Sequence, residues 1–506
     1  MTANDDKSGN LYSAFADCFP VDRSKTLLET DTGEVYSYAD AEAGSARVAN
    51  CLLSMGLESG DRVTVQVEKS PQMLFLYLGV LRAGLVFHPL NTAYTEDELA
   101  YFLGDAAPRL VVCDPGRLAL FKTLQQRCNI PHMLTLDKLG QGDLADTVKA
   151  HRTDFNDTAR APEDMAALLY SSGTTGRPKG IVLSNSNLLE NARVLKDYWG
   201  FTASDTLLHV LPIFHVHGLF VAIGCVLMSG AGMRWLSGFD VQGVLKALSG
   251  TTVLMGVPTY YTRLLAEPSF NRKHCQSVRL FISGSAPLLS ETFEAFRQRT
   301  GHTILERYGM TETGMNTSNP LDGERRAGTV GFPLPGVQLR IVDAEGIEVE
   351  DGAVGDIEVK GANVFQGYWN LPEKTAEEFT RDGFFRTGDK GQVDRDGYVS
   401  IVGRAKDMII TGGLNVYPKE IELLIDDVDG VSESAVIGLP HPDFGEAVTA
   451  VIVTDAGAEI SEQDIIDHVK AHAANFKVPK AVYFVGSLPR NTMGKVQKNL
   501  LRDKFS

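Results

Sequence analysis

Apolar and polar positions alternate in a way that predicts strands and helices in turn along the first part of the chain. Residues 62–68 change between polar and apolar side chains with a period of two, which predicts a strand. Residues 71–83 carry apolar side chains at helical spacing, and Ser70 is a suitable N-cap. Further strands are predicted at 85–88 and 109–113. This alternation favours an α/β fold with a largely parallel sheet.

The same alternation of strands and helices returns later in the chain and is then followed by a different pattern. A strand at 278–283, a helix at 286–299 and a strand at 303–306 repeat the α/β theme. After about residue 355 the pattern predicts short strands and turns, and Asp-Gly at 396–397 predicts a hairpin. From Pro418 onward strands and helices alternate again, over a length that is normal for a small separate domain.

Composition and charge narrow the class of protein. The 506 residues exceed what one hydrophobic core usually covers, so we expect two or more domains. With 43% hydrophobic and 22% charged residues the chain is not disordered, and its net charge of -16 argues against a nucleic-acid partner. The last stretch, 468–506, differs from the rest because it holds eight Lys or Arg against one acid. A solvated basic surface and a domain that brings cations to an anionic ligand both fit it.

The cysteines, the start of the chain and its longest apolar run together predict a cytoplasmic protein. The six cysteines form no CxxC pair, which suits a reducing compartment, and the start of the chain is polar and acidic, so we expect no signal peptide. The longest apolar run, 218–233, is too short and too rich in glycine to cross a membrane, so no membrane partner is expected.

The strongest local signal is the segment Tyr170-Ser-Ser-Gly-Thr-Thr-Gly-Arg-Pro-Lys-Gly180, which lies between two predicted strands. Its glycines let the backbone approach a ligand, its hydroxyls donate hydrogen bonds, and Lys179 adds a positive charge. It is not a Walker A loop, because Gly180 follows the lysine and Pro178 disfavours helix. The segment therefore predicts a phosphate site of another kind.

This segment resembles the phosphate loop of the adenylate-forming superfamily, which includes acyl-CoA synthetases, luciferase and adenylation domains. Seven more motifs of that family follow in order: 211–215, 282–287, 306–312, 387–389, 403–407, 411–415 and 489–495. The resemblance implies an α/β fold with a large N-terminal domain at 1–405, built from parallel sheets and a β-rich subdomain. It also implies a small, mobile α+β C-terminal domain at 406–506, with the hinge at Lys406.

The resemblance also implies an ATP site and a Mg²⁺ site. Glu312 is a hard oxygen ligand suited to Mg²⁺ that bridges phosphates, with Thr175 as a second metal contact. Asp389 suits the ribose hydroxyls, and Arg404 would complete ribose or phosphate binding. The implied ATP-binding residues are Ser171, Ser172, Gly173, Thr174, Thr175, Gly176, Lys179, Ser285, Ala286, Glu306, Arg307, Tyr308, Gly309, Met310, Thr311, Asp389 and Arg404.

By the same resemblance, Lys495 stabilises the charge that develops between the acid and the α-phosphate, with Lys498 as the local alternative. His215 follows the apolar run 207–214, which predicts a strand. With Glu312 and Lys495 in the catalytic set, His215 borders the acyl pocket, and we expect it to gate and orient the substrate. His217 is a neighbour that could share this role. Gly412, Gly413 and Leu414 would line the channel for CoA.

The acid is suggested by a second, narrower resemblance. The segments HVHGLFVA, VLMGVPTYYTRLL, FISGSAPL and ERYGMTETGMNTSNP are similar to those of malonyl-CoA synthetases. In those enzymes the residues matching Arg263 and Ser283 hold the distal carboxylate, as a guanidinium does well. The expected reaction converts malonate, ATP and CoA into malonyl-CoA, AMP and diphosphate through malonyl-adenylate. Pro258 suits a helix start, which puts Arg263 one turn into the helix, and helical spacing also allows Arg263 to face solvent.

Other functions stay open from the sequence. The acid could be methylmalonate, a short fatty acid or an aryl acid, which would make the chain a methylmalonyl-CoA synthetase or a generic acyl-CoA synthetase. A luciferase-like oxygenase and a nucleotide-binding protein without turnover are alternatives from other classes. The intact Lys495, Glu312 and Asp389 argue against the last of these. The sequence leaves the oligomeric state open.

Overall fold

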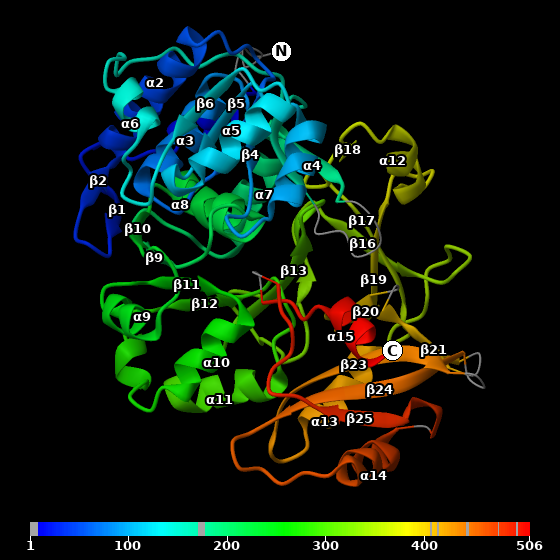
Figure 1. Ribbon diagram of the computed structural model, residues 1–506. Helices are drawn as coiled ribbons and strands as arrows, with labels where there is room; N and C mark the ends of the chain where they lie inside the picture. Colours follow the sequence, from blue (N-terminus) through cyan, green and yellow to red (C-terminus); the bar gives the residue numbers. More distant parts are fainter. Residues whose placement is uncertain are drawn as a thin grey trace, which may run out of the picture.

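The structure is a computed structural model, which describes residues 9–170, 178–404, 407–411, 414–441, 445–473, 475–491 and 494–506 (Figure 1). For residues 414–415 it describes the backbone alone. The fold is mixed α/β, with a large N-terminal part and a small C-terminal part, as the sequence predicts.

Two large, mostly parallel sheets form the N-terminal part. The nine-stranded sheet has the order β15-β14-β13-β12-β11-β9-β10-β1-β2. Its strands are β1 (Thr26–Thr30), β2 (Val35–Ser37), β9 (Thr206–His209), β10 (Gly232–Trp235), β11 (Val253–Gly256), β12 (Leu280–Ser283), β13 (Leu305–Met310), β14 (Gly314–Ser318) and β15 (Phe332–Pro333). The run from β1 to β13 is parallel, so the carboxyl ends of β9, β11, β12 and β13 meet at one edge.

The seven-stranded sheet has the order β18-β8-β7-β4-β3-β5-β6. Its strands are β3 (Arg62–Gln66), β4 (Val86–Pro89), β5 (Leu110–Cys113), β6 (His132–Thr135), β7 (Met165–Tyr170), β8 (Gly180–Ser184) and β18 (Gly367–Tyr368). The predicted strands at 62–68, 85–88 and 109–113 correspond to β3, β4 and β5, which pair in parallel. The predicted helix at 71–83 is α3 (Pro71–Arg82), and Ser70 caps it by accepting from the Met73 amide.

Helices pack against these sheets, as Figure 1 shows for the blue-to-green part of the chain. They are α1 (Leu11–Ala16), α2 (Tyr38–Ser54), α4 (Glu96–Ala106), α5 (Leu118–Arg127), α6 (Asp143–Val148), α7 (Asn185–Tyr198), α8 (Ile223–Ser229), α9 (Val241–Leu248), α10 (Pro258–Ala266) and α11 (Ser290–Thr300), with short helical turns at Pro115–Arg117 and Arg272–Cys275. A π-helix, His217–Ala222, precedes α8. The main core lies between the two sheets, and α3 is buried almost throughout.

A β-rich subdomain follows, as predicted. Its four antiparallel strands are β16 (Gln338–Val342), β17 (Gly355–Lys360), β19 (Phe385–Val393) and β20 (Val399–Arg404), with α12 (Pro372–Glu378) beside β18. Asp396-Gly397 turns the chain from β19 into β20, and Gly397 has the left-handed φ of +87° that favours glycine there.

The C-terminal part has its own core around β23 and β24. It contains β21 (Ile409–Thr411), β22 (Leu414–Val416), α13 (Pro418–Asp426), β23 (Val431–His441), β24 (Gly445–Thr454), α14 (Glu462–His472), a short turn Asn475–Lys477, β25 (Ala481–Phe484) and α15 (Lys498–Phe505). The segment after β25, red in Figure 1, runs toward β13 in the middle of the molecule.

Two predicted elements are wrong in their bounds. The helix predicted from 286 begins at Ser290. Ala286 is excluded from it because a residue before proline, here Pro287, disfavours the helical region. The apolar run 207–214 continues as a strand only to His209, where its neighbours β10 and β11 also end. His215 therefore lies in a loop several residues beyond the strand.

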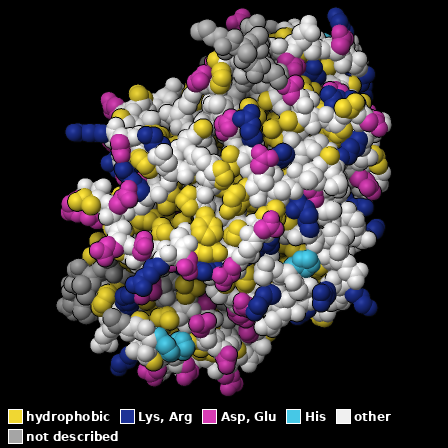
Figure 2. Space-filling model, turned by 180° about the vertical axis from the view of Figure 1, so that it is seen from behind, with side chains coloured by type: hydrophobic (Ala, Val, Ile, Leu, Met, Phe, Trp, Pro, Cys, Tyr) yellow, Lys and Arg dark blue, Asp and Glu magenta, His cyan; other side chains and the backbone are white. Residues whose placement is uncertain are grey.

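The face seen from behind in Figure 2 carries Lys or Arg and Asp or Glu side chains side by side, with hydrophobic side chains gathered near its centre. Neither sign of charge forms a continuous patch there. Within the described ranges, no helix combines the length and the apolar character that crossing a membrane requires.

Candidate active site

Asp389 and Arg404 lie opposite each other in the antiparallel pair β19–β20. Arg404 Nε is 3.2 Å from Asp389 Oδ1, and Tyr308 Oη donates to Asp389 Oδ2 at 2.5 Å. Asp389 is buried, with 4% of its surface exposed. Both carboxylate oxygens keep acceptor capacity beyond these contacts, so the corner can receive the two hydroxyls of a ribose.

The second carboxylate of the site, Glu312, is buried beside positive charges. Burial raises the pKa of Glu312, while Arg404 and Lys179 act in the opposite direction. Tyr368 Oη lies 3.4 Å from Glu312 Oε1, and the Lys179 ammonium stands 4.1 Å above the Tyr368 ring. Lys179 also lies 3.6 Å from Glu378 Oε1 on α12. The end of the phosphate loop is thus held next to Glu312.

The strands on both sides of the phosphate loop form a hairpin, with Tyr170 opposite Gly180. A Cβ on Gly180 would stand 2.8 Å from the Trp369 side chain, so only glycine fits this close approach. The predicted ATP contacts in the loop itself, at Ser171, Ser172, Gly173, Thr174, Thr175 and Gly176, lie outside the described residues.

Lys495 reaches this cluster from the C-terminal domain. Desolvation of its ammonium group and the neighbouring Arg404 lower its pKa to about 8, although Asp389 and Glu312 counteract them. Lys495 as a whole residue is exposed to solvent. The alternative, Lys498, is instead engaged 2.5 Å from Glu422 Oε1 inside the C-terminal domain. The structure therefore brings Lys495, and not Lys498, to the carboxylates.

On the acyl side, Ser283 ends β12 and is fully buried, and its Oγ has no hydrogen-bond partner among the described residues. His215 Nδ1 is likewise buried and unpaired in that part of the chain. Burial, with Lys495 and Arg307 nearby, lowers the pKa of His215 to about 3, so the ring is neutral. His217 Nδ1 lies 3.2 Å from Ser285 Oγ. A neutral His215 suits an orienting role better than proton transfer.

The buried cation beside these groups is Arg307. Its side chain is only 3% exposed, and its Nε and Nη2 have no partner among the described residues. A Cβ on Gly284 would lie 2.4 Å from Arg307 Cζ, so the guanidinium packs directly under the loop after β12. Burial lowers its pKa to about 10, which still leaves it charged at neutral pH. The sequence motif placed Arg307 with ATP, and that contact stays a prediction, while the structure packs Arg307 beneath the loop that follows Ser283.

Arg263, the residue expected to hold the distal carboxylate, is exposed in the structure. Helix α10 begins at Pro258 as expected and turns Tyr261 and Leu264 inward, which leaves Arg263 on its exposed face. Its charge acts on the neighbouring Tyr260. Contact between Arg263 and an acid stays a prediction, and it would need the side chain to turn inward.

The remaining predicted contacts form two turns at the same edge. Ser285, with a left-handed φ of +71°, and Ala286 lie in the loop after β12, and Glu306 Oε1 holds that loop by accepting from the Leu288 amide at 2.9 Å. Burial raises the pKa of Glu306 to about 8. Gly309, Met310 and Thr311 follow a bulge in β13 and lead into the turn before β14.

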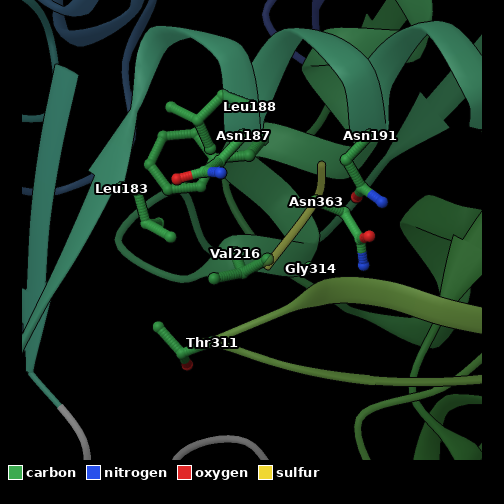
Figure 3. Close-up of a pocket in the computed structure, with 9 residues that line it drawn as sticks. Leu183, Asn187, Leu188, Asn191, Val216, Thr311, Gly314 and Asn363 are labelled. Atoms are coloured by element: carbon green, nitrogen blue, oxygen red, sulfur yellow. The ribbon is translucent and has the colours of Figure 1, made fainter. Parts of the chain in front are cut away.

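A small pocket lies behind that turn (Figure 3). Leu183, Val216 and Thr311 face one another on one side of it, and Asn191 and Asn363 lie on the other. Water-sized free space amounts to about 10 Å³, enough for roughly one water molecule and not for a substrate. This pocket is therefore too small to be the site of the substrates.

The predicted hinge Lys406 and the predicted CoA contacts Gly412 and Gly413 lie outside the described residues. Leu414 begins β22, which pairs with β21, so the backbone after the two glycines turns back as a hairpin. Across the described ranges, no cluster of three or more His, Cys, Asp or Glu could hold a metal ion by itself. All six cysteines are free thiols.

The chain is similar to solved and curated proteins over almost its whole length. ATP-bound MatB from Rhodopseudomonas palustris is 52% identical, with 99% of both chains covered and a TM-score of 0.97. The apo form of the same protein gives 0.86 at the same identity and coverage, so the described domain arrangement is closer to the ATP-bound form.

Two curated relatives are named as CoA ligases. A malonate–CoA ligase of Arabidopsis thaliana is 33% identical and covers 98% of this chain and 89% of its own length. A sulfoacetate–CoA ligase of Cupriavidus necator is 34% identical, with 93% of each covered.

The family models complete this picture. The model of the AMP-binding enzymes matches residues 15–369, and the model of their C-terminal domain matches residues 420–495. Both matches agree with the two parts of the fold. The chain belongs to the AMP-binding enzyme family and is an AMP-forming acid–thiol ligase.

Proposed function

We propose that this chain is a malonyl-CoA synthetase. Malonate attacks the α-phosphate of ATP through one carboxylate oxygen, which gives malonyl-adenylate and releases diphosphate. The thiol of CoA then attacks the acyl carbon, its proton is lost, and AMP leaves to give malonyl-CoA. The observation that carries the assignment is Arg307, a buried guanidinium with unpaired donors beside the equally unpaired Ser283 hydroxyl.

A buried cation without a partner is costly, and a fatty or aryl acid would not compensate it. The distal carboxylate of malonate would accept from Arg307 Nε and Nη2 and from Ser283 Oγ, which would satisfy all three donors at once. The relatives named for malonate and for sulfoacetate support this, since both acids carry a second negative group.

The nucleotide side follows from the same geometry. Asp389, steadied by Tyr308 and Arg404, would accept from the ribose hydroxyls, and the loop that ends at Lys179 would hold the phosphates. Glu312 fits a Mg²⁺ ion that arrives with ATP, because one carboxylate plus substrate phosphates is the usual protein site for this ion. Its raised pKa agrees with a carboxylate that awaits a cation. The ion would supply charge neutralisation at the phosphates.

Lys495 would donate to the oxygens between malonate and the α-phosphate, where negative charge develops in the first step. The neutral His215 would border the acid and keep it aligned. A division into 1–405 and 406–506, with a pivot at Lys406, would let the C-terminal domain withdraw Lys495 and present Gly412 to Leu414 to CoA. This division is supported by the family matches, which end at residue 369 and resume at residue 420. The cytoplasmic location stays a prediction from composition.

The experiment compares Arg307→Met with Arg263→Met. Both substitutions delete a guanidinium and keep an unbranched side chain. Arg263→Met is the matched control, because Arg263 lies on the exposed face of α10. Diphosphate release is measured with malonate, methylmalonate, sulfoacetate and butyrate. We expect Arg307→Met to lower kcat/KM for malonate by about 2–5 kcal/mol, the usual range for stranding one partner of a buried charge pair.

Butyrate should gain relative to malonate in Arg307→Met, and the KM for ATP should change little because Asp389 is untouched. If kcat/KM for malonate falls strongly in Arg263→Met and not in Arg307→Met, the distal carboxylate is bound by Arg263 instead of Arg307. A wild type that prefers butyrate would refute the dianionic substrate altogether, and a preference for sulfoacetate or methylmalonate would change the acid while keeping the cation's role.

A further inference from the structure

A lysine that the reaction does not use lies buried behind the acyl site. Lys69, in the connection between β3 and α3, is 8% exposed. Its ammonium donates to His209 Nδ1 and to the His209 carbonyl, both at 2.8 Å, and stands 4.4 Å above the Trp235 ring. Three donors thus meet three acceptors, and no carboxylate lies within ion-pairing distance in the described part of the chain.

The contacts of His209 fix which of its nitrogens carries the proton. Nε2 lies 2.9 Å from the Gly218 carbonyl, which can only accept, so Nε2 must be protonated. Nδ1 is then the bare nitrogen that accepts from Lys69. Burial lowers the pKa of His209 well below its ordinary value, which keeps this neutral tautomer. Lys69 and the Gly218 carbonyl therefore select one orientation of the ring.

The two ends of one loop meet at this ring. His209 ends β9, and Gly218 is the second residue of the π-helix, so the bond closes the segment 210–217 at its base. That segment carries His215 and ends at His217, which lies 3.2 Å from Ser285 Oγ. The loop is also packed on itself, since a Cβ on Gly218 would lie 2.1 Å from the Pro212 carbonyl oxygen.

We propose that Lys69 and His209 are positioning residues that clamp the loop 210–217 and thereby hold His215 in place against the bound acid. Neither side chain touches a reacting group, and both act through the loop. The proposal deepens the proposed function, because it rests on this loop bordering the acid, but it does not depend on which acid is used.

The test is steady-state diphosphate release with full-length variants. Lys69→Met keeps contact with Trp235 and removes the donor, which strands buried acceptors. We expect the KM for the acid to rise about tenfold, while the KM for ATP stays within about twofold. His209→Gln keeps an amide donor for the Gly218 carbonyl and should stay close to wild type. His209→Leu should match Lys69→Met, and the double variant Lys69→Met/His209→Leu should be no worse than His209→Leu.

Lys25→Met is the matched control. Lys25 also donates to two backbone carbonyls, those of Ala203 and Gly230, but away from the loop. Its loss should lower the melting temperature without moving the KM for the acid. Equal rises in both KM values for Lys69→Met, or no change in either, would overturn the clamp. If Lys69→Met does not fold, equal acid KM values for His209→Gln and His209→Leu would overturn it.

The acid in these assays is whichever one the wild type uses best. A wild type that turns over butyrate would refute the malonate assignment and still allow the clamp to be measured. Failure of the clamp with malonate as the best acid would leave the proposed function standing.

Discussion

At the scale of single residues, unpaired buried polar atoms gather at one place. His215 Nδ1, His217 Nε2, Ser283 Oγ, Glu306 Oε2 and the Arg307 guanidinium all lack partners within the described ranges. Folded proteins satisfy nearly all such groups, so a cluster of exceptions marks a site that a ligand completes. All of these residues could be named from the sequence. The lack of hydrogen-bond partners for their polar atoms could not be predicted, because it depends on packing between β12, β13 and the loop after β9.

Lys495→Ala should separate the two half-reactions. Charge at the α-phosphate develops only during adenylate formation, and one such donor is worth about 3–4 kcal/mol. Diphosphate release should therefore fall by that amount, while thioester formation from supplied malonyl-adenylate and CoA stays largely intact. Lys498→Ala is the control, because Lys498 is engaged with Glu422. Equal losses in both half-reactions of Lys495→Ala would contradict the role.

Residue choice also shows where sequence reasoning stops. Arg263 and Arg307 were both visible as cations near family motifs, and only three-dimensional packing separates them. Helix α10 turns Tyr261 and Leu264 inward, and Arg263 then faces away. Arg307, on β13, is buried beneath Gly284, which has no Cβ to exclude it. A lone sequence contains neither the rotation of the helix nor the register of the strands.

At the scale of elements, local sequence signals predicted caps and turns well, but the ends of helices and strands were predicted less well. Ser70 capping α3, Pro258 beginning α10 and Asp396-Gly397 closing a hairpin are local effects, and the structure confirms all three. The exclusion of Ala286 from α11 was also predictable, since a residue before proline disfavours the helical region, but the start at Ser290 was not. The end of β9 at His209 was not, because the neighbouring strands decide it.

The loop between β12 and α11 should respond to Glu306→Gln in a pH-dependent way. The carboxyl has an ordinary pKa of 4.5 and a pKa of about 8 in the folded protein. The folded state therefore holds a proton that the unfolded state loses, so wild-type stability falls as pH rises from about 4.5 to about 8. Glutamine keeps an oxygen for the Leu288 amide and cannot ionise.

Urea unfolding of wild type and Glu306→Gln at pH 5 and pH 9 provides the measurement. The stability of the variant relative to wild type should be higher at pH 9 than at pH 5, by an amount on the order of 3 kcal/mol. The same difference at both pH values would show that Glu306 ionises normally in the folded protein.

At the scale of the whole molecule, the small domain was predictable as a separate unit, but its placement was not. Composition and pattern predicted a compact basic region near the C-terminus, and the structure gives it a core of its own. The place of Lys495 near the large domain depends on packing between the two parts, which a local sequence pattern does not contain. The chain as a whole is more similar to the ATP-bound form of MatB than to the apo form.

Lys406→Pro should arrest the change between orientations. Proline fixes φ near −65° and blocks the backbone rotation that a pivot must absorb. We expect exchange of diphosphate into ATP to remain measurable and malonyl-CoA formation to fall by about a hundredfold or more. Proline at Asp394, in the nearby hairpin turn, controls for general damage to the subdomain. Unchanged malonyl-CoA formation would place the pivot elsewhere.

The charges of Arg404, Asp389 and Glu312 act on the Lys495 ammonium. If Lys495 serves the first half-reaction from this place, the C-terminal domain would cap the large domain while the acid is being activated. CoA would then enter through the same opening by which diphosphate leaves, so diphosphate must be released before CoA binds. This order of release and binding is a ping-pong scheme. Reciprocal plots of initial rate against ATP at several CoA concentrations should give parallel lines, and lines that intersect would show that all three substrates assemble together.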